Sequence, residues 1–526
     1  MILRLVRYMS QNQNQLMKAC MVGDIKAVIV QLKGGVDVNA TDAQGGTALL
    51  YAADGGHEQC FLALLRTGAA VNARDNEGFS ALMLSCQNGH EQIALYLLQA
   101  DADVNAQNNN GVSALMFACS IGHEQIARNL TKAGANLESE TNRGSTALIL
   151  CALDGHQHVV RFMIEAGANV DASQKEGYTA LMFACQNGHE QVVGDLIKAD
   201  ASLESKQIQG FTALMFCSQN GHEQCVRKLI DAGASPESKT DEGLTALILA
   251  AQNGHEHVLL AVLQAGAAVD ATDNLGWTAL MQAAQGGHDL CARELIKANA
   301  EIDKPGPQQF TALMFACWNG HEQVARNLIQ AGASVNAQAN DGFSALMLSC
   351  QNGHDSVALA LLNAGAAVNA QSNAGWTALM LAAQDGHKQC LEELIKAKAE
   401  IDKPGHEQCT ALMYAAQNGH QRCLVDLIQA GANVDASQKD GHTALFFASK
   451  NGHMECVSAL KESSSVKAET GTSIREQNKD EMGNKTAENL ATYPDSTVRS
   501  TQGMPSDQFL SSNTTPPSIP LTLPPS

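Results

Sequence analysis

The stretch GFTALMFCSQNGHEQ, residues 210–224, decides how the rest of the chain is interpreted. It places Cys217, His222 and Glu223 within seven positions of one another, a spacing that could mark a metal or catalytic cluster. The same pattern recurs throughout the chain, and a fixed period near 33 residues changes the meaning of every motif inside it. The repeat must therefore be understood before the chemistry of these side chains.

A Thr or Ser followed by Ala-Leu recurs every 33 residues, without insertion, from Thr47 to Thr443. Ten residues after each comes a histidine preceded by Gly, from His57 to His453, and a degenerate first copy has Asp24 instead. Thr or Ser suits a helix start, the next apolar residues have helical spacing, and Gly suits a left-handed helix end. We therefore predict fourteen units of two helices and a hairpin, which bury their apolar faces only by stacking.

These features resemble the ankyrin-repeat family, whose core runs G-x-T-P-L-H-x-A-A, then G-H, then L-L-x-x-G-A. Here TPLH becomes TALM, TALI, TALL or TALF, so the family's Pro and His are both absent. The resemblance implies an all-α repeat solenoid of stacked helix-turn-helix-hairpin units. We predict a capping segment at 1–13, about 14 repeats at 14–461, and a Ser/Thr/Pro-rich tail at 462–526, whose composition predicts disorder.

The repeat positions of the cysteines indicate that these side chains belong to the hydrophobic core and not to a metal or catalytic site. Most of the 15 lie at helix positions where other copies have Ala, Ile, Val or Leu, and Cys409 alone lies in a hairpin. The sequence has no Cys-x-x-Cys pair with zinc spacing, phosphate loop, HExxH, GxSxG or EF-hand loop. Cys217, His222 and Glu223 are therefore interpreted as parts of the repeat, and we expect no metal, no cofactor and no enzymatic activity.

The charge narrows the class of partner. The formal charge is −20, and five basic and eight acidic residues after position 461 leave −17 on the preceding part. An acidic surface disfavours nucleic acid and favours basic proteins or peptides. The sequence also predicts no signal peptide and no membrane span, while unpaired thiols suggest a reducing compartment. We expect a monomer in the cytoplasm, with the nucleus as a second compartment.

In the family, partners contact the hairpin tips and the concave side of the first helices. The residue before each Thr or Ser is a tip position and is aromatic in seven copies: Phe79, Tyr178, Phe211, Trp277, Phe310, Phe343 and Trp376. These rings either pack as a stabilising ladder or anchor a partner. Seven residues after the Thr or Ser, the expected concave positions include Gln186, Gln219, Gln252, Gln351 and Gln417, with Trp318 as the exception. The amides either form a solvated face or bind an extended backbone.

A protein-binding scaffold or adaptor is the predicted function, and a structural or mechanical tether linking cytoskeletal or membrane-associated proteins is the alternative. The resemblance also implies candidate sites of asparagine hydroxylation in a Val-Asn-Ala context: Asn39, Asn72, Asn105, Asn336 and Asn369.

A longer period of 99 residues is superimposed on the repeat. The Gly that closes the second helix is replaced at Asp101, Asp200, Asn299 and Lys398. The hairpins DKPGPQQF and DKPGHEQC also diverge, which reflects either block duplication or a distinct docking feature.

Overall fold

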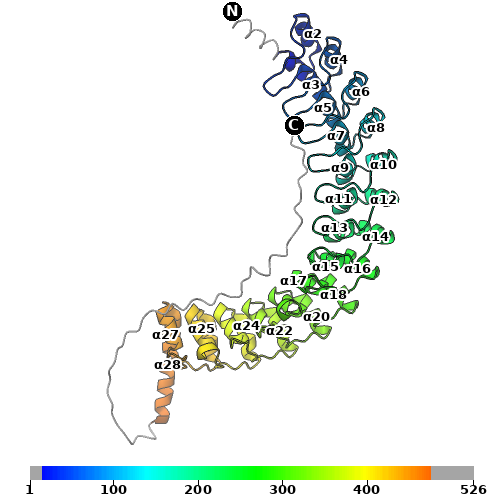
Figure 1. The fold of residues 1–526 in the computed structure, drawn as a ribbon. Helices are drawn as coiled ribbons and strands as arrows, with labels where there is room; N and C mark the ends of the chain where they lie inside the picture. Colours follow the sequence, from blue (N-terminus) through cyan, green and yellow to red (C-terminus); the bar gives the residue numbers. More distant parts are fainter. Residues whose placement is uncertain (1–14, 476–526) are drawn as a thin grey trace, which may run out of the picture. The chain divides into compact units, whose positions relative to one another are not determined.

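The computed structural model describes residues 15–475. The chain divides into two units, residues 1–465 and 466–526, and the first contains the repeats. In it, fourteen helix pairs follow one another, beginning with a helix at residues 15–21 and α2 (Ile25–Lys33). Figure 1 shows the consecutive pairs side by side, with the first helices in one row and the second helices in another. The predicted repeat solenoid is confirmed.

Each first helix after the initial pair begins directly after its Thr or Ser, which is the N-cap residue. The Thr47 hydroxyl, for example, accepts a hydrogen bond from the Leu50 N–H at 3.3 Å, which satisfies one of the free donors of the first turn. These first helices are α3 (Ala48–Asp54), α5 (Ala81–Gln87), α7 (Ala114–Ile121), α9 (Ala147–Leu153), α11 (Ala180–Gln186), α13 (Ala213–Asn220), α15 (Ala246–Gln252), α17 (Ala279–Gly286), α19 (Ala312–Trp318), α21 (Ala345–Gln351), α23 (Ala378–Asp385), α25 (Ala411–Asn418) and α27 (Ala444–Lys450).

Each second helix begins after the histidine, and many have an acidic residue in the first turn that complements the helix dipole, as Glu58 does in α4. They are α4 (Glu58–Arg66), α6 (Glu91–Gln99), α8 (Glu124–Lys132), α10 (Gln157–Glu165), α12 (Glu190–Lys198), α14 (Glu223–Asp231), α16 (Glu256–Gln264), α18 (Asp289–Lys297), α20 (Glu322–Gln330), α22 (Asp355–Asn363), α24 (Lys388–Lys396), α26 (Gln421–Gln429) and α28 (Met454–Arg475).

The hydrophobic core lies between the helices of successive repeats. Each first helix packs on the next first helix, and each second helix on the next second helix. Leu64, Leu97 and Leu130, which share one repeat position, are fully buried, and fourteen of the 15 cysteines are buried as well. Cys409, in its hairpin, is half-buried. The predicted core role of the helical cysteines is confirmed.

The last helix differs from the other second helices. It continues to Arg475, so the described helix runs into the segment predicted as a disordered tail. Residues 476–526 and the predicted capping segment at 1–13 lie outside the described residues. Within residues 15–475, every helix is too short or too polar to cross a membrane.

The predicted 99-residue period is visible in the backbone. Asp101, Asp200, Asn299 and Lys398 all adopt left-handed conformations, with φ between +58° and +64°. The two divergent hairpins contain short 3-10 turns, η1 (Pro307–Gln309) and η2 (His406–Gln408), each with two further non-glycine residues at positive φ. Most L-residues are strained in this region, so these turns are costly where other repeats use glycine.

Lys398→Gly is expected to stabilise the repeats around it by about 1 kcal/mol, because lysine gains nothing from the left-handed conformation at φ +64°. Hydrogen exchange of amides in α24 and α26 measures the effect locally, which matters because a long array need not unfold in one step. Lys396→Gly, in the last turn of α24, is the control and should destabilise by about 0.5–1 kcal/mol. Equal effects at both positions would contradict the assignment of strain to Lys398.

Candidate functional site

Each of the three side chains that opened the sequence question has its own structural role. Burial raises the pKa of the Cys217 thiol well above its ordinary value, which favours the unreactive protonated form. His222 donates from Nε2 to the Gln186 carbonyl at 3.1 Å, and Glu223 pairs with Arg227 at 2.8 Å. Within the described residues, no group of three or more His, Cys, Asp or Glu side chains could hold a metal ion. The cluster is therefore built from structural contacts.

The Gly-His pair joins neighbouring repeats. His255 Nε2 donates to the Gln219 carbonyl of the preceding repeat at 3.0 Å, which fixes the tautomer because a carbonyl only accepts. The His255 ring also lies against Gly221, where an added Cβ would come 2.6 Å from Nδ1. Gly221 has φ +79°, so the left-handed turn and the neighbouring ring both require glycine. Equivalent bonds to the preceding repeat are made by His57, His90, His156, His189, His222, His288, His321, His354, His387 and His453.

Acid is expected to weaken these joints. Burial lowers the pKa of both His255 and His321 below the ordinary 6.5. Their neutral forms therefore contribute stability above that value, and the contribution is lost as pH falls through the lowered pKa. The urea concentration at the unfolding midpoint should decrease as the pH is lowered from 7 to 5. The decrease should be smaller in a variant with both His255→Gln and His321→Gln. His257→Gln, at an exposed position, should keep the parental slope; a pH-independent midpoint would contradict the account.

A second joint lies at a hairpin position that is always Asn, Asp or Glu. Its side-chain oxygen accepts the backbone N–H found 31 residues later, in the next repeat. Asn39 Oδ1, for example, accepts from Ala70 N at 2.7 Å, and Glu237 Oε1 accepts from Ala268 N at 2.7 Å. The same bond occurs from Asn72, Asn105, Glu138, Asp171, Glu204, Asp270, Asp303, Asn336, Asn369 and Asp402.

Sequence reasoning treated these asparagines only as candidate modification sites and missed the joint. The sequence did contain a signal for this joint, because one repeat position is restricted to Asn, Asp and Glu, which all have a side-chain oxygen that can accept a hydrogen bond. Asn72, like Asn39, also donates from Nδ2 to a carbonyl of the next repeat, here that of Asp101 at 3.4 Å. Hydroxylation of the five asparagines stays a prediction.

The tip aromatics make contacts between repeats. Tyr178, Phe211, Trp277 and Phe310 are buried, whereas Phe79, Phe343 and Trp376 are half-buried. Four contacts join a tip ring to a ring 38 residues later and are spaced 99 residues apart, with centroid distances between 4.3 and 5.5 Å: Phe79–Phe117, Tyr178–Phe216, Trp277–Phe315 and Trp376–Tyr414. In these four contacts the tip ring packs on a first-helix ring of the next repeat, so the rings connect successive repeats, whereas a ladder of neighbouring tips stays a prediction. A partner-binding role stays a prediction, and in this conformation the half-buried rings are the accessible ones.

The predicted glutamine row lies at the C-terminal ends of the first helices. Gln186, Gln219, Gln252, Gln351 and Gln417 are all half-buried, and their backbone carbonyls accept the histidine bonds. Trp318 is half-buried too; its carbonyl accepts from His354 at 2.9 Å, and its ring lies 5.6 Å from that of Phe310. Partner binding by these side chains stays a prediction.

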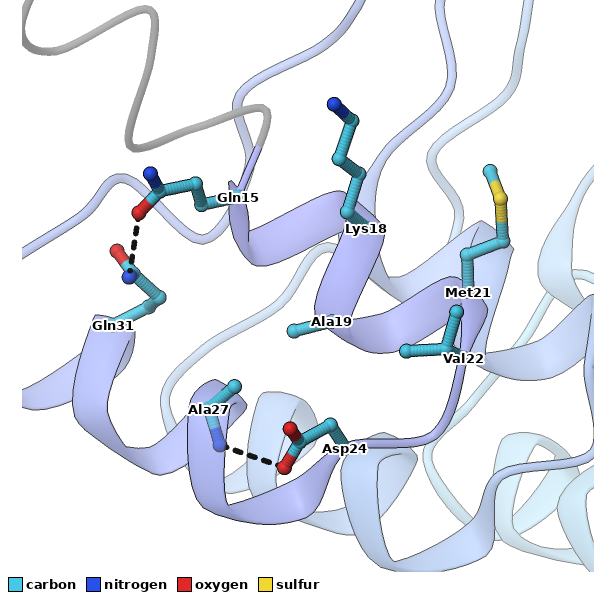
Figure 2. Close-up of a pocket in the computed structure, with 8 residues that line it drawn as sticks. All are labelled: Gln15, Lys18, Ala19, Met21, Val22, Asp24, Ala27 and Gln31. Carbon is cyan, nitrogen blue, oxygen red and sulfur yellow. Dashed lines mark hydrogen bonds between the residues drawn. The ribbon is translucent and has the colours of Figure 1, made fainter.

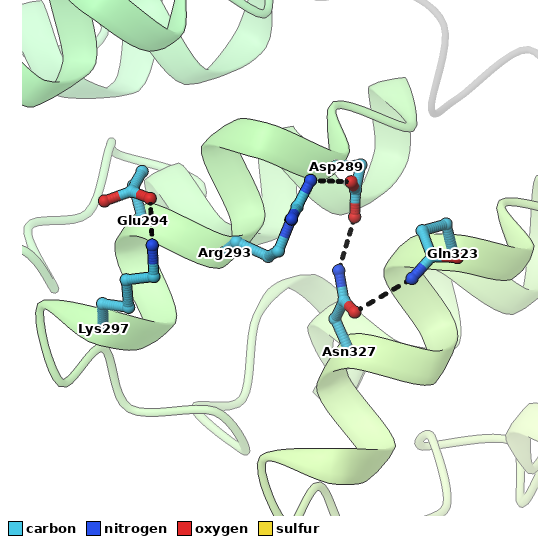
Figure 3. Close-up of polar contacts among 6 residues, drawn as sticks. All are labelled: Asp289, Arg293, Glu294, Lys297, Gln323 and Asn327. Carbon is cyan, nitrogen blue, oxygen red and sulfur yellow. Dashed lines mark hydrogen bonds and ion pairs between the residues drawn. The ribbon is translucent and has the colours of Figure 1, made fainter.

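The second helices carry their own polar contacts between repeats. Figure 3 shows Asp289 of α18 between Arg293 of the same helix and Asn327 of α20, which also accepts from Gln323 at 3.2 Å. The positions of Asp289 and Asn327 are occupied by ion pairs in the neighbouring three-repeat blocks. These pairs are Lys228–Glu190 in the block before and Lys388–Asp426 in the block after. Many charges on this side therefore have partners within the molecule.

The hairpins differ from the second helices in this respect. In residues 15–464 the ion pairs of the hairpins are Lys304–Glu301 at 3.7 Å and Lys403–Glu400 at 3.4 Å. Exposed carboxylates without an ion pair in this part of the chain recur at one tip position, in Glu77, Glu176, Glu242, Glu407 and Asp440, and the exposed Arg143 occupies the same position in one other repeat. The hairpin edge thus presents carboxylates to an external cation.

Comparison with known proteins agrees with this geometry. The family model for ankyrin repeats, described in sets of three copies, matches overlapping segments from residue 16 to residue 493. No match was found among curated proteins. Ankyrin repeats are generally protein–protein interaction modules, and proteins built from them are typically non-enzymatic scaffolds. From its repeats, the chain belongs to the ankyrin-repeat family.

Proposed function

We propose that the protein is a scaffold or adaptor that binds basic segments of partner proteins along its hairpin edge and first-helix face. The observation that carries this proposal is the row of exposed carboxylates at the hairpin tips, which lack ion pairs among the described residues. Lysine- or arginine-rich segments complement such a row and are steered to it over long distances. Repeating the same feature along the stack allows several weak contacts to act together.

The half-buried aromatic rings support the same surface. Phe343 and Trp376 lie at tips in successive repeats, and Trp318 lies on the first helix of the repeat before them. Trp318 and Trp376 are each held by a neighbouring ring, so they lose little conformational freedom when a partner covers them. We infer that this group supplies apolar contacts beside the acidic tips.

A charge-removal experiment tests the proposal. The variant Glu77→Gln, Glu176→Gln, Glu242→Gln keeps side-chain size, and Gln44 and Gln209 already occupy this position in other repeats. Proximity labelling in native cells, followed by binding measurements with the purified partners, should show affinity reduced about threefold to 150-fold, because each of the three exposed pairs contributes about 0.2–1 kcal/mol.

The matched control removes three charges from the second helices. Glu58→Gln, Glu91→Gln, Glu256→Gln has the same formal charge, and Gln157 and Gln421 are the natural precedents at that position. The control should keep its partners. Equal loss from both variants, or loss from neither, would contradict the assignment of binding to the hairpin edge.

The joints between repeats favour a second candidate, a mechanical tether, because a stack joined at every hairpin can transmit force along its length. Deleting residues 200–298, one 99-residue block, separates the two functions. Adaptor binding should survive the deletion at reduced valency, whereas a tether should fail because its length changes. We also propose a cytoplasmic location, supported by fifteen free cysteines, and no enzymatic role, supported by the typically non-enzymatic character of ankyrin-repeat proteins.

A further inference from the structure

The first repeat differs from the others at the positions that face a preceding repeat. Gln15 stands where later first helices begin with Ala, and Gln31 stands where later second helices have a fully buried leucine such as Leu64. The two glutamines bond to each other, with Gln31 Nε2 donating to Gln15 Oε1 at 3.1 Å. A polar outer face of this kind is typical of a terminal repeat in a solenoid.

The same repeat accepts a bond from His57 of the next repeat but has no repeat histidine of its own. Asp24 replaces the histidine, and its carboxylate accepts from the Ala27 N–H at 3.0 Å, capping its own helix instead of reaching a preceding repeat (Figure 2). The charged group lies beside a groove of about 440 Å³, lined by Gln15, Lys18, Ala19, Met21, Val22, Asp24, Ala27 and Gln31.

The groove retains an apolar strip that the polar substitutions leave uncovered. Met21 is 52 % exposed and Val22 71 % exposed, and both line the groove beside Ala19 and Ala27. Figure 2 shows Ala19 between the Gln15–Gln31 and Asp24–Ala27 pairs, with Met21 and Val22 together on the side of the groove away from Gln15 and Gln31. Exposed apolar side chains gathered at one end of a repeat array mark a surface that something covers.

We propose that residues 1–13 of this same chain bind in this groove and complete the cap of the array. The segment joins the groove directly, because Gln15 is both one of its lining residues and the second residue after the segment. Tethering at this distance gives the segment a high effective concentration, so it outcompetes an unlinked partner.

The composition of the segment fits the groove. Seven of its first nine residues are apolar, in the order MILRLVRYM, and its charged side chains are Arg4 and Arg7, with no acidic residue through position 13. The apolar side chains match Met21 and Val22, and an arginine can pair with Asp24. Lys18 is the like charge in the groove, and its long side chain can turn toward solvent.

Thiol labelling of the full chain tests the proposal. Val22→Cys introduces a thiol in the groove, and the native thiols give a slow background because fourteen are buried. The same thiol is then placed in a second protein that also carries Leu3→Asp, Leu5→Asp and Val6→Asp. Maleimide should label position 22 at least about tenfold faster in this second protein than in the first, because burial of the three apolar side chains is what holds the segment in the groove. Met21→Cys provides a second probe if the first perturbs folding.

Val30→Cys is the matched control. Val30 is 66 % exposed on α2 but does not line the groove, so its labelling rate should be the same with and without the three aspartates. Equal rates at position 22 in both backgrounds would overturn the proposal. Protection that disappears on dilution would overturn it as well, because the occupant would then be a second copy of the chain.

Discussion

Gly221→Ala is expected to destabilise the junction between two repeats by about 3 kcal/mol, the sum of a left-handed backbone penalty and overpacking. Gly221 has φ +79°, and its added Cβ would come 2.6 Å from His255 Nδ1 and 2.7 Å from His255 Cε1. The ring is held by its bond to the Gln219 carbonyl, so it cannot move away without losing that bond. Hydrogen exchange of amides in α14 and α16 measures the loss.

Gly233→Ala, in the same repeat, is the control for this prediction. Gly233 also has a left-handed backbone, φ +94°, but nothing lies within 4 Å of an added Cβ. It should cost only the backbone term, about 1–2 kcal/mol. If the two substitutions cost the same, the contact with His255 contributes nothing.

Phe310→Ala is expected to cost about 3–5 kcal/mol, the range for removing a large buried aromatic side chain. Phe310 is fully buried, and its ring lies 5.3 Å from that of Phe315 and 5.6 Å from that of Trp318. Phe343→Ala, the same change at the same tip position one repeat later, should cost about half as much or less, because that ring is half-buried.

Urea unfolding combined with hydrogen exchange of α19 and α21 separates the two variants. The comparison also limits which tip aromatics can be tested for binding. A partner lost from Phe310→Ala would be uninformative, since the local fold is expected to fail, whereas loss from a folded Phe343→Ala variant would implicate the ring itself. Comparable destabilisation by both changes would contradict the burial difference between the two tips.

The sequence alone was sufficient for the fold because its signals are local and repeated. The Thr or Ser caps, the left-handed glycines and the buried cysteines are each specified within one repeat, and each prediction about them is confirmed. The strained conformation of Lys398 was also predictable, because Gly occupies its position in most repeats.

Contacts between repeats were harder to predict. A histidine ten residues after Thr245 gives no indication that its Nε2 reaches Gln219, because that partner lies 36 positions earlier and its backbone carbonyl has no sequence signature. The burial of Trp277 depends on a ring 38 residues later, Phe315. For the same reason, the polar outer face of the first repeat could not be predicted from the sequence, because it depends on a hydrogen bond between Gln15 and Gln31, which lie 16 positions apart.

The central claim is that the Gly-His pair is a joint between repeats and not a chemical site. A double-mutant cycle on Gly221→Ala and His255→Ala tests it most directly, with stability measured by hydrogen exchange of α14 and α16. Removing the ring should relieve the clash of the added Cβ, so the double variant should be more stable than the sum of the single changes by about 1 kcal/mol or more. Additivity within about 0.5 kcal/mol would show that the two residues act independently and would contradict the claim.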